Sequence, residues 1–217
     1  MVLKNIKHIW WDLDDTLYAP VQGYSNAKLK VLVKEYARLA KISLSEAKKR
    51  YKKDYEKFGS MSNLFIARFG LSRIYGQKII NNVDRKKYIK HSPKVVDFFK
   101  EFKKKFPKIK HSVLSNSEKK QVLLTLDLIG LDRKLFTFIK STIEMGAPKP
   151  YVECYKSLIK ISKAPAKQIV YVGDREKADV IPAKKAGLKV ILINKNAKKS
   201  KADFVVKEIS KILRLFK

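Results

Sequence analysis

The sequence predicts an α/β fold with a Rossmann-like parallel sheet as its core and an inserted all-helical subdomain. Short apolar runs rich in β-branched and aromatic residues alternate with amphipathic segments of helical period, as a parallel sheet covered on both faces requires. One long stretch after the first apolar run has helical periodicity only. At 217 residues the chain suits one domain that carries a subdomain. We expect the core to comprise residues 1–18 and 92–217, and the insertion residues 19–91.

The core strands are expected where β-branched and aromatic residues cluster between polar segments, at residues 6–11, 110–115, 136–139, 169–174, 189–193 and 203–206. Ser92 and Pro93 have the character of a cap and first residue of a helix that runs to about Lys105. Gly130 and Gly187 suit the left-handed position that closes a helix before the next strand. The apolar stripe of the last segment predicts a helix packed on the core, formed by Ile209, Ile212, Leu213 and Phe216.

The inserted segment consists of helical patterns in succession. Apolar residues from Leu29 to Ala40 recur at helical spacing, and Ser43 with Glu46 has the spacing of a capping box before a second helix. Residues 62–74 and 77–90 also have a helical pattern. A connection of this length is far longer than a strand-to-helix connection needs, so the segment is expected to fold as a unit of its own.

The composition is strongly basic, with 50 Lys and Arg, 20 Asp and Glu, and a formal net charge of +30. Because 45% of the residues are hydrophobic, a disordered basic tail is excluded. The positive charge is nearly uniform along the chain, so any binding of nucleic acid is expected to be nonspecific. Runs such as KKRYKK at 48–53 fit either an RNA surface or the solvated face of a helix.

The cysteine content and the hydropathy of the chain indicate the cellular compartment in which the protein is expected. The one cysteine, Cys154, excludes an internal disulfide and a cysteine zinc cluster, as expected in a reducing environment. The apolar runs are too short to span a membrane, and the first residues lack the pattern of a signal peptide. We therefore expect a cytoplasmic protein without a membrane partner; a monomer and a homodimer both remain open.

Two short clusters of acids stand out in this basic chain. Asp12, Asp14 and Asp15 follow the first predicted strand, and the segment 174–179 after the fourth predicted strand holds three more acids. In an open parallel sheet, ligands bind beyond the carboxyl ends of the strands at the switch point. If the two strands are neighbours, Asp12 and Asp174 converge there. Two carboxylates in one place suit Mg²⁺, which completes its coordination with water and a phosphate oxygen.

The pattern resembles the haloacid dehalogenase-like (HAD) hydrolase superfamily. WWDLDDTLY at 10–18 resembles its first motif, an apolar strand followed by DxDxT. VLSN at 113–116 resembles the second motif, APKP at 147–150 the lysine motif, and YVGDREKAD at 171–179 the fourth motif, GDxxxxD. The four motifs occur in the family's order, each at a predicted strand end or loop, and the resemblance covers nearly the whole chain outside the insertion. The insertion resembles the family's helical cap.

The resemblance implies a role for each matching residue. Asp12 would be the nucleophile that forms an aspartyl phosphate, and Asp14 the general acid and base. Mg²⁺ would be held by the side chains of Asp12 and Asp174 and by the backbone carbonyl of Asp14. The Ser115 hydroxyl, the Asn116 backbone N–H and Lys149 would bind the phosphoryl group, and Lys149 would also keep Asp12 ionised. Asp179 would act from behind, on Lys149 or on a metal-bound water. Thr16 would fix the geometry of its loop.

Asp14 also bears on the type of reaction. Family members that displace halide lack an acid at this position, whereas an oxygen leaving group needs a proton, so the resemblance implies a phosphatase. The expected function is a Mg²⁺-dependent phosphomonoester hydrolase acting on a small phosphorylated metabolite or nucleotide. The alternatives are a mutase, a nucleic-acid end phosphatase, or a basic nucleic-acid-binding protein. Tyr151, Val152 and Arg175 depart from the family's usual residues but remove no catalytic group.

Overall fold

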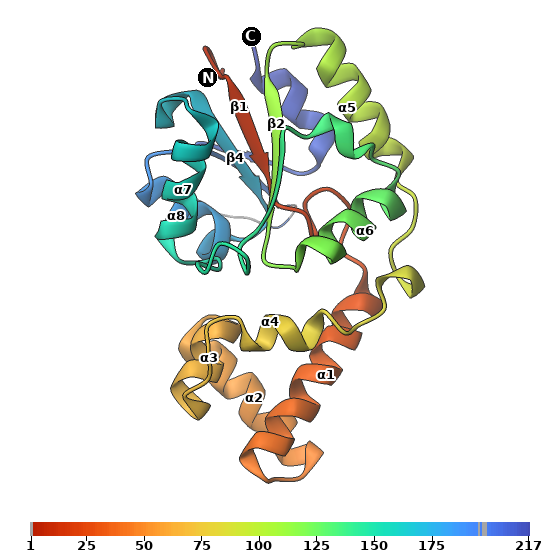
Figure 1. The fold of residues 1–217 in the computed structure, drawn as a ribbon, viewed down its shortest axis with the longest axis vertical. Coiled ribbons are helices and arrows are strands. Elements are labelled where there is room, and N and C mark those ends of the chain that lie inside the picture. Colours follow the sequence, from red (N-terminus) through yellow and green to blue (C-terminus); the bar gives the residue numbers. More distant parts are fainter. Residues whose placement is uncertain (1, 195, 197–198) are drawn as a thin grey trace. The chain divides into compact units, whose positions relative to one another are not determined.

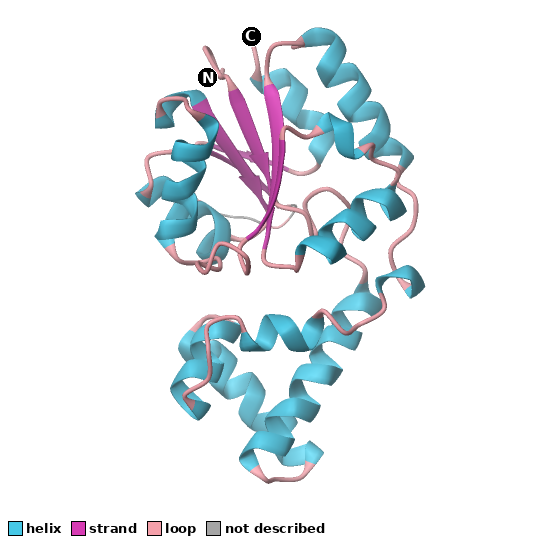
Figure 2. Cartoon of the chain, in the orientation of Figure 1, coloured by secondary structure: helices cyan, strands magenta, loops and turns pink. Residues whose placement is uncertain are grey.

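The computed structural model describes residues 2–194, 196 and 199–217, and it divides the chain into two compact units. One unit comprises residues 1–20 and 90–217, and the other residues 21–89. The first holds all the strands of the described residues, and the second is helical (Figures 1 and 2). The α/β class with a Rossmann-like sheet is thereby confirmed. That the helical unit serves as a cap stays a prediction.

The core is a parallel sheet of six strands in the order β3-β2-β1-β4-β5-β6. The strands are β1 (His8–Trp11), β2 (Lys110–Ser115), β3 (Phe138–Ser141), β4 (Ile169–Gly173), β5 (Lys189–Ile193) and β6 (Phe204–Val206). The core helices are α5 (Pro93–Lys105), α6 (Lys119–Ile129), α7 (Val152–Ser162) and α8 (Ile181–Lys185), with a π-helical turn at Glu176–Val180 and 3₁₀ turns at Arg133–Leu135, Ala166–Gln168 and Ile209–Leu215. Because β1 is central, the chain passes to β2 on one side of it and returns to β4 on the other.

Two adjacent tryptophans of β1 pack against the helices on opposite faces of the sheet, because successive side chains of a strand point to opposite faces. Trp10 packs among residues of α7, and its indole N–H donates to the Ser162 hydroxyl at 2.8 Å. Trp11 faces the other layer, where its ring meets Phe98 and Phe99 of α5 edge-on. Both indoles are fully buried, so the strand that carries Asp12 is held firmly from both faces.

The helical unit has its own core. Its helices are α1 (Gln22–Ala40), α2 (Leu44–Phe58), α3 (Met61–Phe69) and α4 (Tyr75–Ile80), followed by a 3₁₀ turn at Arg85–Lys87. Ser43 caps α2 as predicted, because its hydroxyl accepts from the Glu46 N–H at 3.2 Å, but the Glu46 carboxylate accepts from Arg50 at 2.7 Å. An ion pair with a buried carboxylate joins α2 to α3, where Asp54 accepts from the Arg68 Nε at 2.6 Å and from the Tyr36 hydroxyl at 2.7 Å.

Several predicted elements differ in detail from the structure. The helix predicted at 62–74 ends at Phe69, because Gly70 takes a left-handed conformation. The helix predicted at 77–90 is the short α4 plus a 3₁₀ turn, and the last segment is 3₁₀ rather than α-helical. Ser92 precedes α5 as expected, but its side chain makes no capping hydrogen bond. Among the described residues, the helices are all too short or too polar to cross a bilayer.

Candidate active site

Three predicted site residues lie at the carboxyl ends of three adjacent strands. Asp12 follows β1, Ser115 ends β2, and Asp174 follows β4. The sheet places β1 between the other two, and the Asp12 N–H donates to the Val172 carbonyl at 2.8 Å, which extends the pairing to this residue. The predicted convergence of Asp12 and Asp174 is therefore present at this edge of the sheet.

Lys149 occupies the centre of the site and is only 2% exposed. Its ammonium lies 2.7 Å from a carboxylate oxygen of Asp12 and 2.8 Å from one of Asp179. It also donates to the Tyr171 hydroxyl at 3.1 Å. An ammonium has three N–H groups, and these three partners can take one each. Lys149 is therefore fixed in position with its charge directed at Asp12.

Asn116 anchors the loop that carries Lys149. Its carboxamide nitrogen donates to the Lys149 carbonyl at 3.0 Å, and its oxygen accepts from the Lys149 N–H at 2.8 Å. The Thr142 hydroxyl donates to the same oxygen at 2.6 Å. The sequence reasoning considered only the backbone N–H of Asn116 and missed this side-chain role. Its signal was the residue type, because a carboxamide can donate to and accept from one peptide at once.

Asp14 is partly exposed and is held by two hydroxyls. One carboxylate oxygen accepts from the Tyr18 hydroxyl, and the other accepts from the Ser117 hydroxyl at 3.3 Å. The Ser117 N–H donates to the Ser115 hydroxyl oxygen at 3.1 Å. Ser117 thus links Asp14 to the end of β2. Sequence reasoning did not find Ser117, because nothing in the local pattern places residue 117 beside residue 14.

Asp179 and Thr16 lie behind these groups. The second carboxylate oxygen of Asp179 accepts from the Arg175 N–H at 3.1 Å. Gly173 permits this approach, because a Cβ there would lie 2.6 Å from the Asp179 Cβ and Cγ. The Thr16 N–H donates to the Leu13 carbonyl at 3.4 Å and closes the turn after β1. The Thr16 hydroxyl is buried and has no hydrogen-bond partner in the described part of the chain.

Burial and charge set the protonation of the carboxyl groups. Burial raises the pKa of Asp12 to about 6, and Lys149 opposes this increase. Burial, with the charges of Asp12 and Asp179, raises the pKa of Asp174 to about 8. Burial alone would lower the pKa of Lys149, but the carboxylates of Asp12 and Asp179 raise it, so Lys149 stays charged. The site therefore holds more carboxylates than the lysine can balance.

The acidic group fits a hard divalent cation. Asp12, Asp174 and Asp179 each offer a carboxylate oxygen, and these oxygens lie within 4.8 Å of one another. The Asp174 Oδ1 is buried and accepts no hydrogen bond from any residue that the structure describes. Carboxylate oxygens are the ligands that Mg²⁺ prefers, and a cation would satisfy this oxygen and offset the raised pKa of Asp174. The side chain of Asp14 lies outside this group, and the part predicted for its backbone carbonyl stays a prediction.

Comparisons with known proteins place the fold. The family model described as haloacid dehalogenase-like hydrolase matches residues 9–193. No curated protein sequence matches the chain.

Solved structures give the same fold at low sequence identity. A HAD phosphatase from Thermococcus onnurineus is 19% identical with a TM-score of 0.65, and the match covers 96% of this chain and 97% of that one. YfnB of Bacillus subtilis, a HAD-type protein bound to magnesium, is 16% identical with a TM-score of 0.62 over 97% and 98% of the chains. A 2-haloacid dehalogenase from Pseudomonas syringae is 18% identical with a TM-score of 0.61 over 97% of each chain.

The matching structures thus include both phosphatases and dehalogenases, and at these identities they support the fold alone. The family match spans most of the sequence, including all four motifs and the residues gathered around Lys149. The chain belongs to the haloacid dehalogenase-like hydrolase family.

Proposed function

We propose that this hydrolase is a Mg²⁺-dependent phosphomonoesterase that acts on a small phosphorylated metabolite or nucleotide through an aspartyl phosphate at Asp12. One observation carries the proposal: the buried Asp12 carboxylate is paired with Lys149, and a second, more exposed carboxyl group, Asp14, follows two residues later. In this proposal the first group acts as the nucleophile and the second as the acid.

Asp12 needs to be ionised to attack. Its burial favours the neutral acid, and the ammonium of Lys149 at 2.7 Å counteracts that tendency. One Asp12 oxygen forms a bond to phosphorus while the bond from phosphorus to the leaving oxygen breaks. The leaving oxygen keeps the electron pair and takes a proton from Asp14. The phosphoryl group is then attached to Asp12.

The second half of the reaction returns the groups to their first state. Asp14, now a carboxylate, takes a proton from water, whose oxygen attacks phosphorus and releases phosphate from Asp12. The hydrogen bonds from Tyr18 and Ser117 hold Asp14 in place for both transfers. Ser115 at the end of β2 and the N–H groups that follow it can bind phosphoryl oxygens.

Asp12 and Asp174 would hold the cation, with Asp179 close by and already bound to Lys149. Bound there, Mg²⁺ would neutralise charge on the phosphoryl oxygens and on the crowded carboxylates. The buried Asp174 oxygen accepts no hydrogen bond among the described residues and meets only the Arg175 guanidinium, at 3.7 Å, which supports this placement. Lys149 and Asp179 then act as fixed charges behind the reacting atoms.

Asp14 favours a phosphate ester over an organic halide as the substrate. A departing halide needs no proton, so a dehalogenase has no use for an acid held in this position by two hydroxyls. An alkoxide leaving group is a strong base and needs a proton as it departs. The same reasoning makes Asp14 more important for an alkyl phosphate than for an aryl phosphate, whose leaving phenolate is already stable.

The test compares three substrates, p-nitrophenyl phosphate, an alkyl phosphate and 2-chloropropionate, with Mg²⁺ and with EDTA. We expect Mg²⁺-dependent release of phosphate and no release of chloride. Asp14→Asn should lower kcat for the alkyl phosphate by at least about 100-fold, within the range of general acid catalysis, and lower it less for the aryl phosphate. Chloride release, or phosphate release that EDTA leaves unchanged, would overturn the proposal. An equal decrease of kcat for the alkyl and the aryl phosphate in Asp14→Asn would contradict the role of Asp14 as the acid.

A further inference from the structure

The edge of the core sheet opposite the candidate active site is unusually basic. Three segments meet there: residues 2–11, 102–111 and 209–217. The Leu3 N–H donates to the Leu215 carbonyl at 2.6 Å, and the Lys110 N–H donates to the Lys7 carbonyl at 3.0 Å. These segments carry two, five and three Lys or Arg residues respectively, and no Asp or Glu. The positive charge is nearly uniform along the sequence, but here the fold gathers segments that contain no acid.

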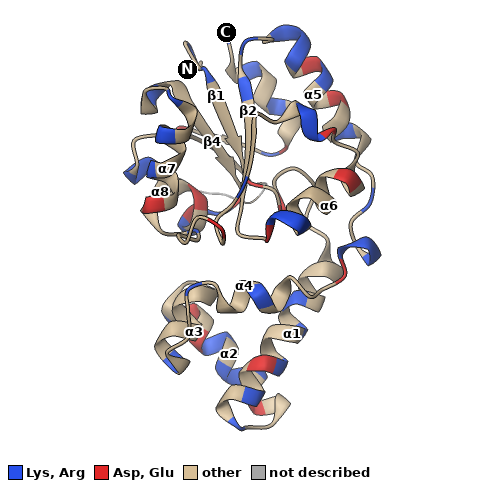
Figure 3. Cartoon of the chain, in the orientation of Figure 1, with Lys and Arg blue, Asp and Glu red and all other residues tan. Residues whose placement is uncertain are grey.

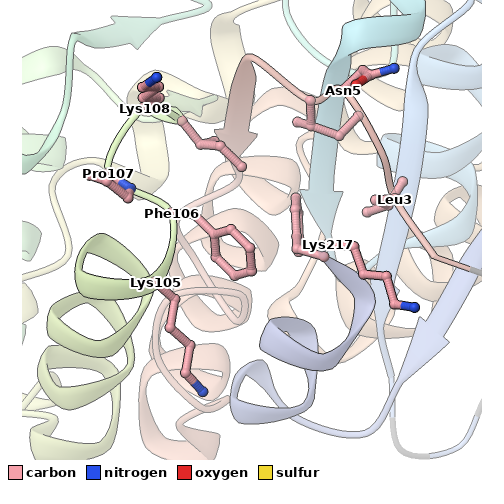
Figure 4. Close-up of a pocket in the computed structure, with 10 residues that line it drawn as sticks. Leu3, Asn5, Lys105, Phe106, Pro107, Lys108 and Lys217 are labelled. Atoms are coloured by element: carbon pink, nitrogen blue, oxygen red, sulfur yellow. The ribbon is translucent and has the colours of Figure 1, made fainter.

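A cavity of about 370 Å³ opens among these segments. Its apolar lining includes Leu3, Ile6, Phe106 and Phe216. Figure 4 shows the Phe106 ring turned inward, toward the chain that carries Leu3 and Lys217. The Phe106 ring packs in tilted contacts with the rings of Phe102 and Phe216, with centroid distances of 5.2 and 5.8 Å. The recess is thus lined by packed aromatic and aliphatic side chains together with polar and charged ones.

Lysines border this recess. Lys105, Lys108 and Lys217 all line it and are exposed. Lys105 is paired with Glu101 at 2.7 Å. Within the part of the chain that the structure describes, the ammonium groups of Lys108 and Lys217 have no carboxylate within ion-pair distance. Figure 3 shows basic residues along α5 interspersed with acidic ones. Unpaired cations around an apolar recess favour a ligand that has both negative charge and an apolar ring.

We propose that this basic cavity binds single-stranded nucleic acid, with one base in the recess against Phe106 and the flanking phosphates on Lys108 and Lys217. Proteins that bind single strands without sequence specificity usually stack bases on aromatic side chains and bind the phosphates with nearby basic residues. The cavity is large enough for one base and is bordered on both sides by cations. The ten basic residues extend past the cavity, so the charge matches a chain of phosphates better than one small anion.

Other polyanions fit less well. A duplex keeps its bases stacked inside, so it would meet the lysines but leave the recess empty. An acidic peptide would supply carboxylates, but only an occasional aromatic side chain for the recess. A single strand supplies a ring with every phosphate.

The proposal does not depend on the phosphatase activity. The cavity lies at the amino ends of β1 and β2, and the candidate active site lies at their carboxyl ends. Strands of four to six residues separate the two by roughly 15 Å, at about 3.3 Å per residue. Binding here would hold a nucleic acid on the core without occupying the catalytic residues.

The test is a fluorescence anisotropy titration of the full chain at several salt concentrations, including 150 mM KCl. The probes are a labelled 12-nucleotide single strand, the same strand with abasic sites throughout, the matching duplex, and a labelled oligo-glutamate peptide. We expect the intact single strand to bind at least fivefold more tightly than the abasic strand and the duplex, because stacking of one base contributes about 1–3 kcal/mol. This comparison needs no protein variant, so folding defects cannot imitate it.

Variants locate the binding. K108A/K217A should weaken binding of the single strand at least fivefold and reduce the salt dependence, because each phosphate contact on a single strand contributes a slope of about 0.7. K52A/K53A removes two exposed lysines of the helical unit, loses the same charge, and should change the affinity less than twofold. Phe106→Leu keeps an apolar floor but removes the ring, and should abolish the preference for intact over abasic strands.

Four outcomes would overturn the proposal. Equal binding of intact and abasic strands, or equal weakening by K52A/K53A, would leave only a nonspecific effect of charge. Loss of all binding at 150 mM KCl would exclude the site as well. Tight binding of the peptide in place of the single strand would identify the cavity as a contact for an acidic protein.

Discussion

The Lys149 ammonium and the Asp12 carboxylate lie 2.7 Å apart, with side chains 1% and 4% exposed respectively. A buried pair of this kind is costly to break, because the partner that remains is an uncompensated charge away from water. Asp179 lies on the other side of the same ammonium at 2.8 Å. One lysine therefore contacts two carboxylates, and the third, Asp174, has only the more distant Arg175 at 3.7 Å, which leaves room for a cation.

Replacing Lys149 by methionine should impair both catalysis and folding. Lys149→Met keeps the length of the side chain but removes the charge, which leaves Asp12 and Asp179 to repel each other. We expect kcat to fall by about 100- to 1,000-fold, as for the loss of one electrostatic stabiliser. The free energy of unfolding should fall by about 3–5 kcal/mol in urea titrations. Lys160→Met, at an exposed position of α7, is the control, and a kcat for Lys149→Met within twofold of the wild type would contradict this role.

Gly173 is predicted to be required for its lack of a side chain. In Gly173→Ala the new methyl group would lie 2.6 Å from Asp179, so Asp179 must move away from Lys149. Hydrolysis should fall at least about tenfold, since a small misplacement of catalytic groups has effects of this size or larger.

Gly187→Ala is the matched control for Gly173→Ala. Gly187 has a φ of +86°, but its new Cβ would lie 3.6 Å from its nearest neighbour, so only backbone strain is added. That strain should lower the free energy of unfolding by about 1–2 kcal/mol and leave kcat unchanged. If Gly173→Ala kept full activity, the geometry of Asp179 would be irrelevant to catalysis.

Two buried histidines should make the stability of the core depend on pH. Burial lowers the pKa of His8, and likewise of His111, from an ordinary value of 6.5 to about 4. The His111 Nδ1 accepts from the Trp11 indole N–H, which can only donate, so protonation there would break this bond. Between pH 6.5 and 4 the unfolded chain binds more protons than the folded chain. The free energy of unfolding should therefore fall as the pH drops through this window, by about 2–3 kcal/mol for each histidine.

Urea titrations at pH 7, 6, 5 and 4 check this dependence. His8→Gln and His111→Asn each keep a polar atom near the histidine nitrogen that is hydrogen-bonded, but the new side chains do not titrate. The free energy of unfolding of the double variant should therefore depend less on pH than that of the wild type. His91→Gln changes an exposed histidine and should leave the profile unchanged. Parallel profiles for the wild type and the double variant would show that the buried histidines do not cause the loss.

The helical unit should depend on the buried carboxylate of Asp54, whose partner Arg68 is partly exposed. Asp54 is 1% exposed and accepts from both Arg68 and Tyr36. Asp54→Asn removes the negative charge and places an amide N–H group next to the donors of Arg68 and Tyr36. The free energy of unfolding in urea titrations should fall by about 2–4 kcal/mol. Glu46→Gln removes an exposed pair with Arg50 on the same helix and should cost under about 1 kcal/mol. Equal costs for the two variants would contradict the importance of burial.

Local signals in the sequence predicted much of the core. Pro93 and the amphipathic pattern that follows give α5 its observed bounds, and β2 also has its predicted limits. The third strand, predicted at 136–139, lies at 138–141 instead. It is an outer strand of the sheet, so hydrogen bonding to β2 includes Lys140 and Ser141, which an apolar pattern does not detect.

The sequence predicted those site residues that lie in a motif or at the end of a strand. Asp12 and Asp174 follow buried strands, so the parallel sheet alone brings them together. The contacts of Asn116 with the Lys149 loop and of Ser117 with Asp14 join segments 33 and 103 residues apart in the chain. Such contacts depend on how loops close, and no period or local propensity encodes that closure.

The measurement closest to the central claim is the capture of the phosphoryl group on the protein. The enzyme is mixed with p-nitrophenyl phosphate and Mg²⁺, quenched during turnover and reduced with borohydride, which converts an aspartyl phosphate to homoserine. Mass spectrometry of the peptide spanning residue 12 should locate homoserine at Asp12 in the wild type and in Asp15→Asn, and at no residue in the inactive Asp12→Asn. Phosphate release by Asp12→Asn at the wild-type rate, or homoserine at another position, would contradict the account.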